Sequence, residues 1–283
     1  MNARLLRTTA LILLATALVA CGGDDDKRSS TTSAETAPTR PLRILVTNDD
    51  GYAATGIDVV TQALDALPDV ELTIVAPATD KSGTGSQTTE GTLTASDEHT
   101  ASGLDATAVN GFPSDSVTYG LDEVMTRPPD VVVSGINRGQ NLGPITVLSG
   151  TVGAAKTAAA RGIPALAASQ GLGDDPQYEV GAELVVAWIS AHRDALIAGT
   201  DTVGVVNLNI PTCTTGAVRG VKQVPLALGA DLALVPADCA SIITNVDDDI
   251  AAFLNGFASV TQLTPAGETV TTSTTFPPEK PST

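Results

Sequence analysis

The sequence predicts an α/β fold: a three-layer sandwich on a mainly parallel, Rossmann-like sheet, with β-hairpin elements near the C-terminal end. Strand-like apolar runs alternate with helix-like segments from residue 42 to residue 210, and this alternation is typical of parallel sheets covered by helices. The composition agrees, because 42% of the residues are hydrophobic but only 3% are aromatic. We therefore expect a core of Ala, Val, Leu and Ile.

The first three elements form a β-α-β unit. Residues 42–47 read as a buried strand, and apolar residues in 57–67 then recur at spacings of three, four and three, which is one face of a helix. These residues are Ile57, Val60, Leu64 and Leu67. A second strand follows at 70–76 and ends at Pro77. The crossover between the two strands is expected to be right-handed.

Three more strands and two more helices are predicted along the middle of the chain. The strands lie at 130–134, 163–169 and 203–210, and the helices lie at 151–161 and 181–197. The Ala-rich helix 151–161 ends before Gly162 and Pro164, which are stop signals. Beyond residue 210 the pattern is weaker, and segments 218–226 and 257–263 are predicted to be strands of hairpin elements.

The N-terminal residues read as an export signal. Arg4 and Arg7 precede an apolar stretch at 11–20, which is too short to span a bilayer comfortably and ends in small residues. The ending Leu18-Val19-Ala20-Cys21 resembles the lipobox of bacterial lipoproteins. This resemblance implies cleavage before Cys21 and lipidation of its thiol, hence an exported cell-envelope lipoprotein anchored to the membrane. The alternative is an ordinary export signal with a chance cysteine.

The remaining chain divides into three parts. Residues 21–41 begin with the lipidated cysteine and continue as a small, polar, Pro-bearing stretch, which we interpret as a flexible tether. Residues 42–263 are expected to form the folded domain. Residues 264–283 are rich in Thr and Pro and are expected to be disordered.

Polar side chains follow three of the predicted strands where each strand ends. Asp49 and Asp50 follow the first strand, Ser82 lies after the second, and Asn137 follows the strand at 130–134. Ligands of α/β sheets bind at the carboxyl ends of the strands, and carboxylate and neutral oxygens are the ligands that Mg²⁺ and Mn²⁺ prefer. These four residues are therefore candidate metal ligands. The alternative for the two aspartates is a solvated turn closed by Gly51.

The segment Ser149-Gly150-Thr151 precedes or opens the predicted helix 151–161. Backbone N–H groups at a helix start attract anions, so these three residues, together with Asn48, are candidate phosphate-binding residues. The alternative is simple helix capping by the two hydroxyls. Capping and phosphate binding can coexist.

Charge and absent motifs argue against several other functions. The formal net charge of −17 disfavours binding of a nucleic-acid polymer, which requires a basic face. The chain has no Gly-x-Ser-x-Gly elbow, and its first β-α turn lacks Gly-x-Gly-x-x-Gly. An α/β-hydrolase triad and dinucleotide binding are therefore unsupported. The two histidines, His99 in a polar loop and His192 in a helix, are expected on the solvated surface.

An ordered series of motifs resembles the SurE family of stationary-phase survival proteins, which are metal-dependent 5′/3′-nucleotidases. The motifs are NDDG at 48–51, APATDKSGTGSQTT at 76–89, NGFPSDSV at 110–117, PDVVVSGINRGQNLG at 129–143 and SGTVGAAKTAAARGIPALAAS at 149–169. The resemblance covers about 42–263. It implies one divalent cation, Mg²⁺ or Mn²⁺. It also implies metal ligands at Asp49, Asp50, Ser82 and Asn137, and phosphate binding at Ser149, Gly150 and Thr151.

The function that this resemblance implies is that of a 5′-nucleotidase, a phosphomonoesterase similar to acid phosphatases that hydrolyses nucleoside monophosphates. Asp49 and Asp50 are the catalytic candidates. Asp50 is the candidate for orienting or deprotonating water, Asp49 is the alternative as nucleophile, and the sequence does not separate the two roles. The alternative function is nucleotide or metal binding without turnover. Phe112 and Leu148 depart from the family pattern, which often has Thr and Tyr there, so base and sugar preference stay open.

Two cysteines remain when the first is lipidated. Disulfides persist in exported proteins, so Cys213 and Cys239 are predicted to form a bridge; two separate buried thiols are the alternative. The resemblance implies dimers or tetramers with exchanged C-terminal segments, but residues 224–244 match the family poorly. We expect the bridge to replace order that the family gains by exchange, and the protein to be a homodimer.

Overall fold

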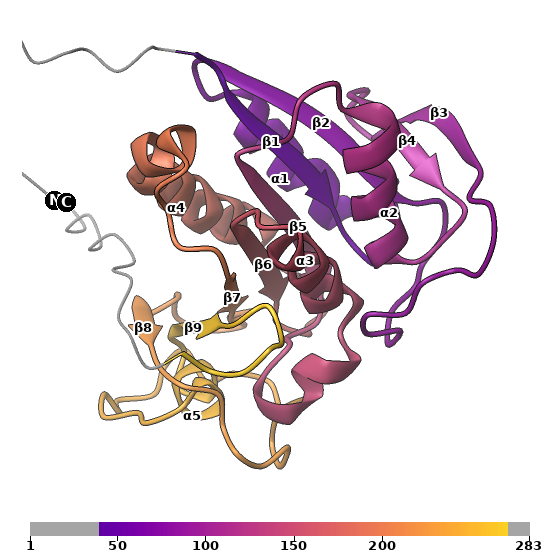
Figure 1. The fold of residues 1–283 in the computed structure, drawn as a ribbon. Helices are drawn as coiled ribbons and strands as arrows, with labels where there is room; N and C mark the ends of the chain where they lie inside the picture. The colour runs from indigo at the N-terminus through magenta and orange to yellow at the C-terminus, as the bar shows by residue number, and fades with distance from the viewer. Residues whose placement is uncertain (1–39, 271–283) are drawn as a thin grey trace, which may run out of the picture. The chain divides into compact units, whose positions relative to one another are not determined.

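The computed structural model describes residues 40–270, in which nine strands form one sheet with helices on both faces (Figure 1). The strand order is β3-β4-β2-β1-β5-β6-β7-β9-β8. The strands are β1 (Leu42–Thr47), β2 (Val70–Pro77), β3 (Ala95–His99), β4 (Asp105–Val109), β5 (Val131–Arg138), β6 (Ala165–Gln170), β7 (Val205–Ile210), β8 (Val221–Gln223) and β9 (Ala258–Leu263). The α-helices are α1 (Thr55–Asp65), α2 (Pro113–Tyr119), α3 (Gly150–Ala160), α4 (Tyr178–Ala198) and α5 (Asp249–Leu254). A π-helical turn (Gly120–Val124) extends α2, and a 3₁₀ helix (Gly143–Leu148) leads into α3.

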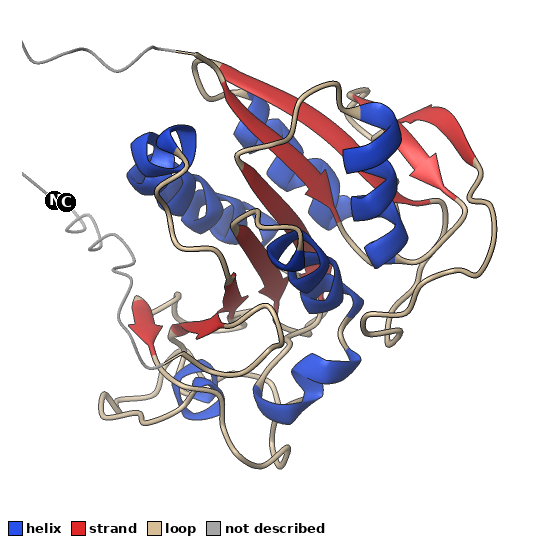
Figure 2. Cartoon of the chain, in the orientation of Figure 1, coloured by secondary structure: helices blue, strands red, loops and turns tan. Residues whose placement is uncertain are grey.

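The predicted fold class is confirmed. The neighbouring strands β4, β2, β1, β5, β6 and β7 all pair in parallel. Helices α1 and α4 cover one face of the sheet and α2 and α3 cover the other, which gives the three layers (Figure 2). Successive side chains of a strand point to opposite faces. Accordingly, Val46 packs in the cluster under α1 and α4, whereas Leu45 packs in the cluster under α2 and α3.

The core is aliphatic, as the composition predicts, and small residues bring α3 close to the sheet. Ala154, Ala155 and Ala158 are fully buried against the strands. Because alanine adds little width to a helix, the first turn of α3 can lie directly beside the end of β1. This close approach positions the candidate site described below.

The C-terminal strands correct one prediction. β8 and β9 pair in parallel, and β9 pairs antiparallel with β7, so the segments 218–226 and 257–263 do not form hairpin elements. A hairpin needs a short turn. Here a long connection that contains α5 separates the two strands, and a crossover of this kind permits parallel pairing.

His99 is exposed, as predicted, whereas His192 is not. His99 is the last residue of β3 rather than part of a loop, and its Nδ1 lies 3.1 Å from Asp105 Oδ1. His192 stacks on Trp188 with ring centroids 4.3 Å apart, and its Nδ1 lies 2.7 Å from Asp201 Oδ2. The His192 side chain is only 14% exposed, so the prediction of a solvated surface residue was wrong. Its aromatic and carboxylate partners compensate this burial.

The ends of the predicted domain lie near the limits of the described chain. The export signal, Cys21 and the tether as far as residue 39 lie outside the described residues, as do residues 271–283 of the tail. Beyond residue 263 the chain continues in a turn, in which Thr264 N donates to Glu268 O (2.8 Å). None of the helices between residues 40 and 270 combines the length and apolarity that crossing a membrane requires.

A disulfide joins Cys213, which follows β7, to Cys239, which lies in the connection between β8 and α5. The two Cα atoms are 5.6 Å apart, a separation typical of disulfides. The bridge therefore ties the connection that carries α5 to the central sheet.

Candidate functional site

The three loops that carry the candidate metal ligands meet at one edge of the sheet because their strands are neighbours. β1 lies between β2 and β5, and all three strands are parallel. Asp49 and Asp50 follow β1, Ser82 lies in the loop after β2, and Asn137 lies at the end of β5. The strand order therefore places all four residues on the carboxyl side of adjacent strands.

Asp49 is buried against the start of α3. It is 2% exposed, and Thr151 Oγ1 donates a hydrogen bond to its Oδ1 (2.5 Å). Burial raises the pKa of Asp49, and hydrogen bonds from Thr151 oppose the rise. A Cβ on Gly150 would lie 2.7 Å from Asp49 Cβ, so glycine is required where α3 meets this carboxylate. The hydrogen of the Thr151 hydroxyl is thus used by Asp49.

Asp50 is more exposed than Asp49, and its carboxylate is bonded to β5 rather than to α3. Its Oδ2 accepts a hydrogen bond from the backbone N–H of Arg138 (2.9 Å), the residue after Asn137. Burial raises the pKa of Asp50 to about 6; the bond from Arg138 lowers it, and the charges of Asp49 and Asp80 raise it. This raised pKa is that of the metal-free site, in which no cation offsets the neighbouring carboxylates.

Ser82 is oriented by a residue that the sequence analysis missed. Both the backbone N–H and the Oγ of Ser82 donate to Asp80 Oδ1, each at 2.7 Å. Lys81 N, in the same loop, donates to Asp49 O (2.7 Å) and ties the loop to the end of β1. An Asp whose side chain bonds to the backbone N–H two residues later forms an Asx turn. The motif Asp80-Lys81-Ser82 could therefore have predicted that Asp80 orients Ser82.

Asn137 presents its amide oxygen. The side chain is largely buried, and its Nδ2 donates to Gly139 O (2.6 Å). Within residues 40–270, Asn137 Oδ1 forms no hydrogen bond. This oxygen is therefore available as a neutral ligand.

The donor set fits a hard divalent cation. It consists of carboxylate, hydroxyl and amide oxygens, which Mg²⁺ and Mn²⁺ prefer. Among the described residues, the ion pairs of Lys and Arg involve other carboxylates and leave Asp49 and Asp50 without one. Two adjacent carboxylates with raised pKa values lack a compensating charge, which a cation would supply. The same residues contain no cluster of three His, Cys, Asp or Glu that could hold a metal, so the neutral oxygens are essential to this set.

The start of α3 combines capping with free donors. Ser149 is the N-cap of α3, and its Oγ accepts a hydrogen bond from Val152 N (3.1 Å). This bond uses an acceptor lone pair, so the Ser149 O–H remains able to donate. The loop after β2 packs on the same turn, because a Cβ on Gly153 would lie 2.2 Å from Gly85 O.

Asn48 closes the turn that follows β1. It is fully buried, its Nδ2 donates to Gly51 O (2.8 Å), and its Oδ1 accepts from Gly51 N (3.1 Å). Gly51 has a φ of +101°, a conformation that favours glycine. Both polar atoms of Asn48 thus close the turn that presents the two aspartates, and these bonds use one of the two hydrogens on Nδ2.

Apolar side chains adjoin the phosphate candidates. Val147 and Leu148, directly before Ser149, are 69% and 59% exposed, and Leu148 O accepts a hydrogen bond from Gly85 N (2.9 Å). Phe112 is half-buried and lies 5.9 Å from Lys81 Nζ, measured to the ring centroid. The two positions that depart from the family pattern, Phe112 and Leu148, are therefore both partly open to solvent.

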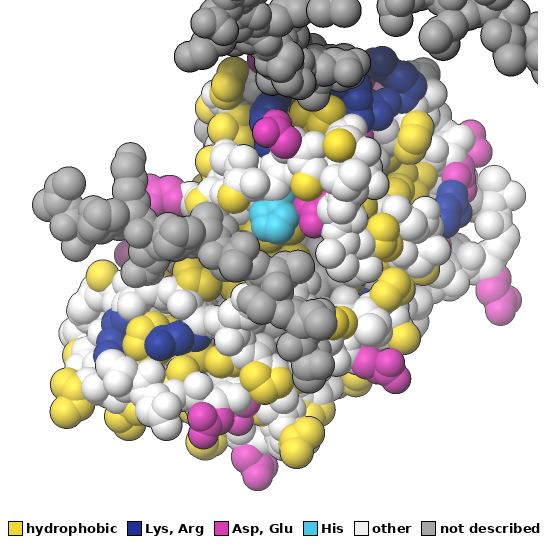
Figure 3. Space-filling model, turned by 60° about the vertical axis from the view of Figure 1, so that its left-hand side comes forward, with side chains coloured by type: hydrophobic (Ala, Val, Ile, Leu, Met, Phe, Trp, Pro, Cys, Tyr) yellow, Lys and Arg dark blue, Asp and Glu magenta, His cyan; other side chains and the backbone are white. Residues whose placement is uncertain are grey.

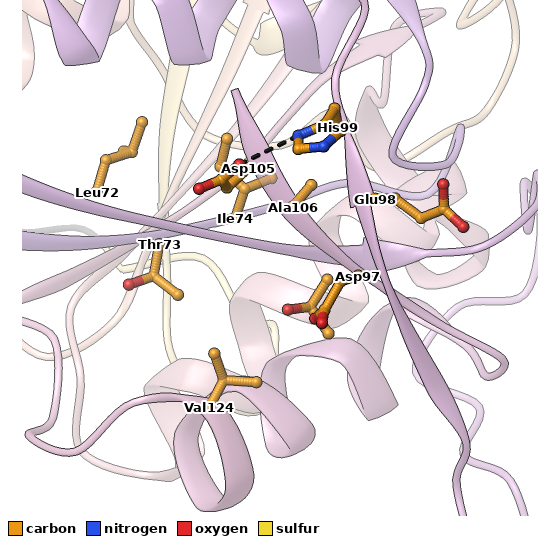
Figure 4. A pocket seen from close by; sticks show the side chains of 10 residues that line it. Leu72, Thr73, Ile74, Asp97, Glu98, His99, Asp105, Ala106 and Val124 are labelled. Atoms are coloured by element: carbon orange, nitrogen blue, oxygen red, sulfur yellow. Dashed lines mark ion pairs between the residues drawn. The ribbon is translucent and has the colours of Figure 1, made fainter. Parts of the chain in front are cut away.

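A pocket of about 390 Å³ lies elsewhere, beside β2, β3 and β4 (Figure 4). Its lining includes Asp97, Glu98 and Asp105, together with His99, which pairs with Asp105. Three carboxylates around one cavity repel a phosphate. The pocket contains none of the candidate ligands, so it is not assigned to substrate.

Comparisons with known proteins agree with this arrangement. A sequence model of the family described as "Survival protein SurE" matches residues 44–230. The chain is 40% identical over 192 residues to "5'-nucleotidase SurE" of Methanopyrus kandleri, covering 66% of this chain and 72% of that protein. It is 41% identical over 187 residues to "5'-nucleotidase SurE 1" of Burkholderia lata, covering 65% and 70%. The crystal structure of the SurE protein from Aquifex aeolicus superposes with a TM-score of 0.62 at 26% identity, covering 79% of this chain and 93% of that one.

Proposed function

The chain belongs to the SurE family, and we propose that it is a metal-dependent phosphomonoesterase of the 5′-nucleotidase type. It hydrolyses nucleoside monophosphates to nucleoside and phosphate. The observation that carries the proposal is the pair Asp49 and Asp50 after β1, because Asp49 contacts the start of α3 and Asp50 is held by the backbone of β5 next to Asn137. This arrangement supports a cation site next to an anion site. The names of the relatives supply the reaction class.

Asp49, Asp50, Ser82 and Asn137 are proposed to hold one Mg²⁺ or Mn²⁺. When bound, the cation supplies positive charge against the phosphate and against charge that develops in the transition state. The nearly complete burial of Asp49 and its bond from Thr151 fix the orientation of its carboxylate before a ligand arrives. Asp80 does the same for Ser82 through two hydrogen bonds.

The phosphate group is proposed to bind at the start of α3. Backbone N–H groups of a first helical turn have no partner within the helix and attract anions, and the Ser149 hydroxyl adds a donor. On the face shown in Figure 3, Lys and Arg side chains occur in small separate groups among acidic and hydrophobic ones. With a net charge of −17, the protein does not attract anions by its overall field. Attraction of the substrate therefore depends on the local charges of the site.

Asp50 is proposed to accept the proton of the water that attacks the phosphorus. Asp49 is almost fully buried and its Oδ1 is used by Thr151, whereas Asp50 is partly exposed and only its Oδ2 is held, by Arg138 N. This difference favours water activation by Asp50 over direct attack by Asp49.

We further propose that the protein is exported and anchored to the membrane through a lipidated Cys21. The lipobox-like ending of the apolar stretch supports this, and so does the bridge between Cys213 and Cys239, because disulfides persist in oxidising compartments. Cys21→Ser should abolish lipid labelling and release the protein from membranes. Mass spectrometry that finds Cys21 as an unmodified N-terminus would remove the anchor from this account.

The assembly proposed is a homodimer. The connection between β8 and α5 exposes large apolar side chains, among them Leu228, Leu232 and Ile242, and exposed apolar surface is often covered by a protein partner. A second copy of the chain is the expected partner in this family. Sedimentation equilibrium should give twice the mass of one chain, and a single-chain mass at all concentrations would exclude the dimer.

Phosphate release from a panel of nucleoside 5′- and 3′-monophosphates tests the proposed activity. Each nucleotide is incubated with Mg²⁺, with Mn²⁺ and with a chelator. We expect release with at least one metal, none with chelator, and recovery when metal is added back. Tight nucleotide binding without release under any condition would instead identify a binding protein and contradict the proposal.

A further inference from the structure

A carboxylate from the C-terminal part of the chain is buried under the loop that leads into α3. Asp249, the first residue of α5, is fully buried and accepts hydrogen bonds from three backbone N–H groups. The donors are Gly143 (2.7 Å), Ala227 (2.7 Å) and Ile250 (2.9 Å). A buried carboxylate is costly unless donors satisfy it, so this arrangement holds the three segments together.

Gly143 connects this carboxylate to the proposed phosphate site. It is the first residue of the 3₁₀ helix before α3, and a Cβ there would lie 3.2 Å from Ile250 Cδ1. Thr146 Oγ1 donates to Gly143 O (2.8 Å), and Ser149 N donates to Thr146 O (3.3 Å). A chain of hydrogen bonds thus runs from Asp249 through Gly143 and Thr146 to the N-cap of α3.

The loop is anchored independently on its other side. Asn141 N donates to Asn209 Oδ1 (2.6 Å), Asn141 Nδ2 donates to Ser169 Oγ (2.8 Å), and Asn141 O accepts from Asn207 Nδ2 (2.9 Å). These partners lie on β6 and β7, in the sheet. The sheet therefore fixes the beginning of the loop, and α5 fixes the part that continues toward α3.

Apolar packing reinforces the contact with α5. Leu142 is fully buried in a small cluster with Ala233, Ile250 and Phe253, separate from the two clusters of the main core. Ile250 and Phe253 belong to α5, and Leu142 directly precedes Gly143. The helix thus supports the loop through side-chain packing as well as through the Asp249 carboxylate.

We propose that Asp249 is a positioning residue for the hydrolysis: it holds Gly143 and thereby sets the position of Ser149 and the start of α3 relative to Asp49. The proposal rests on the proposed function, because it takes this segment as the phosphate site. Asp249 touches neither substrate nor metal. Its effect is transmitted only through the loop.

The test compares Asp249→Asn with Asp248→Asn. The first substitution keeps nearly the same side-chain shape but replaces one carboxylate oxygen by an NH2 group. This group cannot accept a hydrogen bond from the backbone N–H groups that surround it. Asp248 is the N-cap of the same helix and accepts from Ala251 N (2.7 Å) without bonding the loop. Its replacement by Asn therefore removes one charge from the same helix, keeps an equally good N-cap and leaves Gly143 bonded. We expect Asp249→Asn to lower kcat/KM at least ~10-fold, because small displacements of a binding group are costly. The loss should appear mainly in KM.

Inorganic phosphate distinguishes a displaced site from general destabilisation. In Asp249→Asn, the inhibition constant of phosphate should rise by about the same factor as KM. In Asp248→Asn, KM and the inhibition constant should both stay near their wild-type values. If Asp249→Asn does not fold, Thr146→Val interrupts the same chain of hydrogen bonds nearer the site and should raise KM in the same direction. Unchanged KM and unchanged phosphate inhibition in the folded variant would overturn the proposal.

Amide hydrogen exchange supplies a readout that needs no turnover. Exchange is measured for each variant at the same interval below its own Tm. The backbone amides of residues 143–152 should then exchange faster in Asp249→Asn than in Asp248→Asn, while the amides of residues 42–47 in β1 should exchange at the same rate in both variants. Equal exchange of 143–152 in the two variants would overturn the role of Asp249. A wild-type protein that releases no phosphate would refute the proposed function, and the exchange result would still decide whether Asp249 holds the loop.

Discussion

Thr151 on α3 donates a hydrogen bond to Asp49 at the end of β1, across 102 positions of sequence. Both side chains are buried. The bond occupies Asp49 Oδ1 and leaves Oδ2 for a further ligand. It also joins the two halves of the candidate site, because Thr151 belongs to the segment proposed to bind phosphate and Asp49 to the set proposed to bind metal.

Thr151→Val keeps the side-chain shape and removes this donor. Asp49 then loses a bond that opposes the rise of its pKa, so we expect metal affinity and rate to fall by at least ~10-fold. The metal-free protein should lose roughly 1–3 kcal/mol of unfolding free energy. Thr157→Val is the matched control, because Thr157 Oγ1 bonds to Gly153 O within α3 (2.9 Å). Calorimetric titration with Mn²⁺ measures the effect, and equal affinity in the two variants would refute it.

Asp50 should give the metal-free protein a pH-dependent stability. Its folded pKa is raised from 3.8 to about 6, so the folded state binds this proton more tightly than the unfolded state. The resulting stabilisation is fully present below the unfolded pKa and is lost as pH rises through about 6. In chelator, the Tm of the wild type should therefore fall relative to that of Asp50→Asn between about pH 4 and pH 6. A Tm difference that stays constant over this range would contradict the raised pKa.

Asp130 should stabilise the fold at neutral pH. Arg40 and Arg43 bond to its carboxylate at 2.6 Å and 3.2 Å; burial raises the pKa of Asp130, but the bonds from Arg40 and Arg43 lower it below its ordinary value. Asp130→Asn should cost roughly 1–3 kcal/mol at pH 7. A depressed pKa contributes stability that is lost as pH falls through the folded value, so the difference from wild type should shrink below about pH 4.

Urea unfolding at pH 7 and at about pH 3.5 measures this difference. Glu71→Gln is the control, because Glu71 pairs with Arg127 (3.2 Å) where both side chains are exposed, and exposed pairs contribute little. If Asp130→Asn and Glu71→Gln lower the free energy of unfolding equally at pH 7, the hydrogen bonds around Asp130 do not contribute the predicted stability.

The bridge between Cys213 and Cys239 should stabilise the C-terminal part. It joins residues 26 apart in sequence, and chain-entropy reasoning gives about 3.5 kcal/mol for a loop of this size. The double variant Cys213→Ser, Cys239→Ser should lose that amount in urea unfolding. A reductant should weaken the wild type similarly and leave the double variant unaffected. Unchanged unfolding of reduced wild type would show that the bridge contributes nothing.

The fold was predictable where burial imposes a period on the sequence. The apolar residues of α1 recur at helical spacing because one face packs in the core, and β1 and β5 are apolar because both of their faces are covered. β3, with the sequence ASDEH, has no such pattern. It is an edge strand with mostly exposed residues, defined only by pairing with β4. Parallel pairing of β8 with β9 likewise depends on the path of the chain through α5.

The candidate site was predictable as a set of loops but not as a set of contacts. Alternation of strands and helices places Asp49, Ser82 and Asn137 at the same edge of a parallel sheet. It does not reveal that Asn48 closes its own turn or that Thr151 bonds to Asp49. These bonds depend on how closely α3 and the loops approach one another. Tertiary packing determines this distance, and no local sequence pattern predicts it.

The most direct test of the account is the rate of phosphate release from a nucleoside 5′-monophosphate as a function of Mn²⁺ concentration. It is measured for wild type, Asp49→Asn, Asp50→Asn and the control Asp65→Asn, which alters an exposed aspartate at the end of α1. The account predicts a saturable metal dependence in wild type and control. It predicts rates at least ~10²-fold lower for the two site variants at saturating Mn²⁺, with all four proteins folded. Turnover near the wild-type rate in both site variants would contradict the claim that Asp49 and Asp50 form the centre of the site.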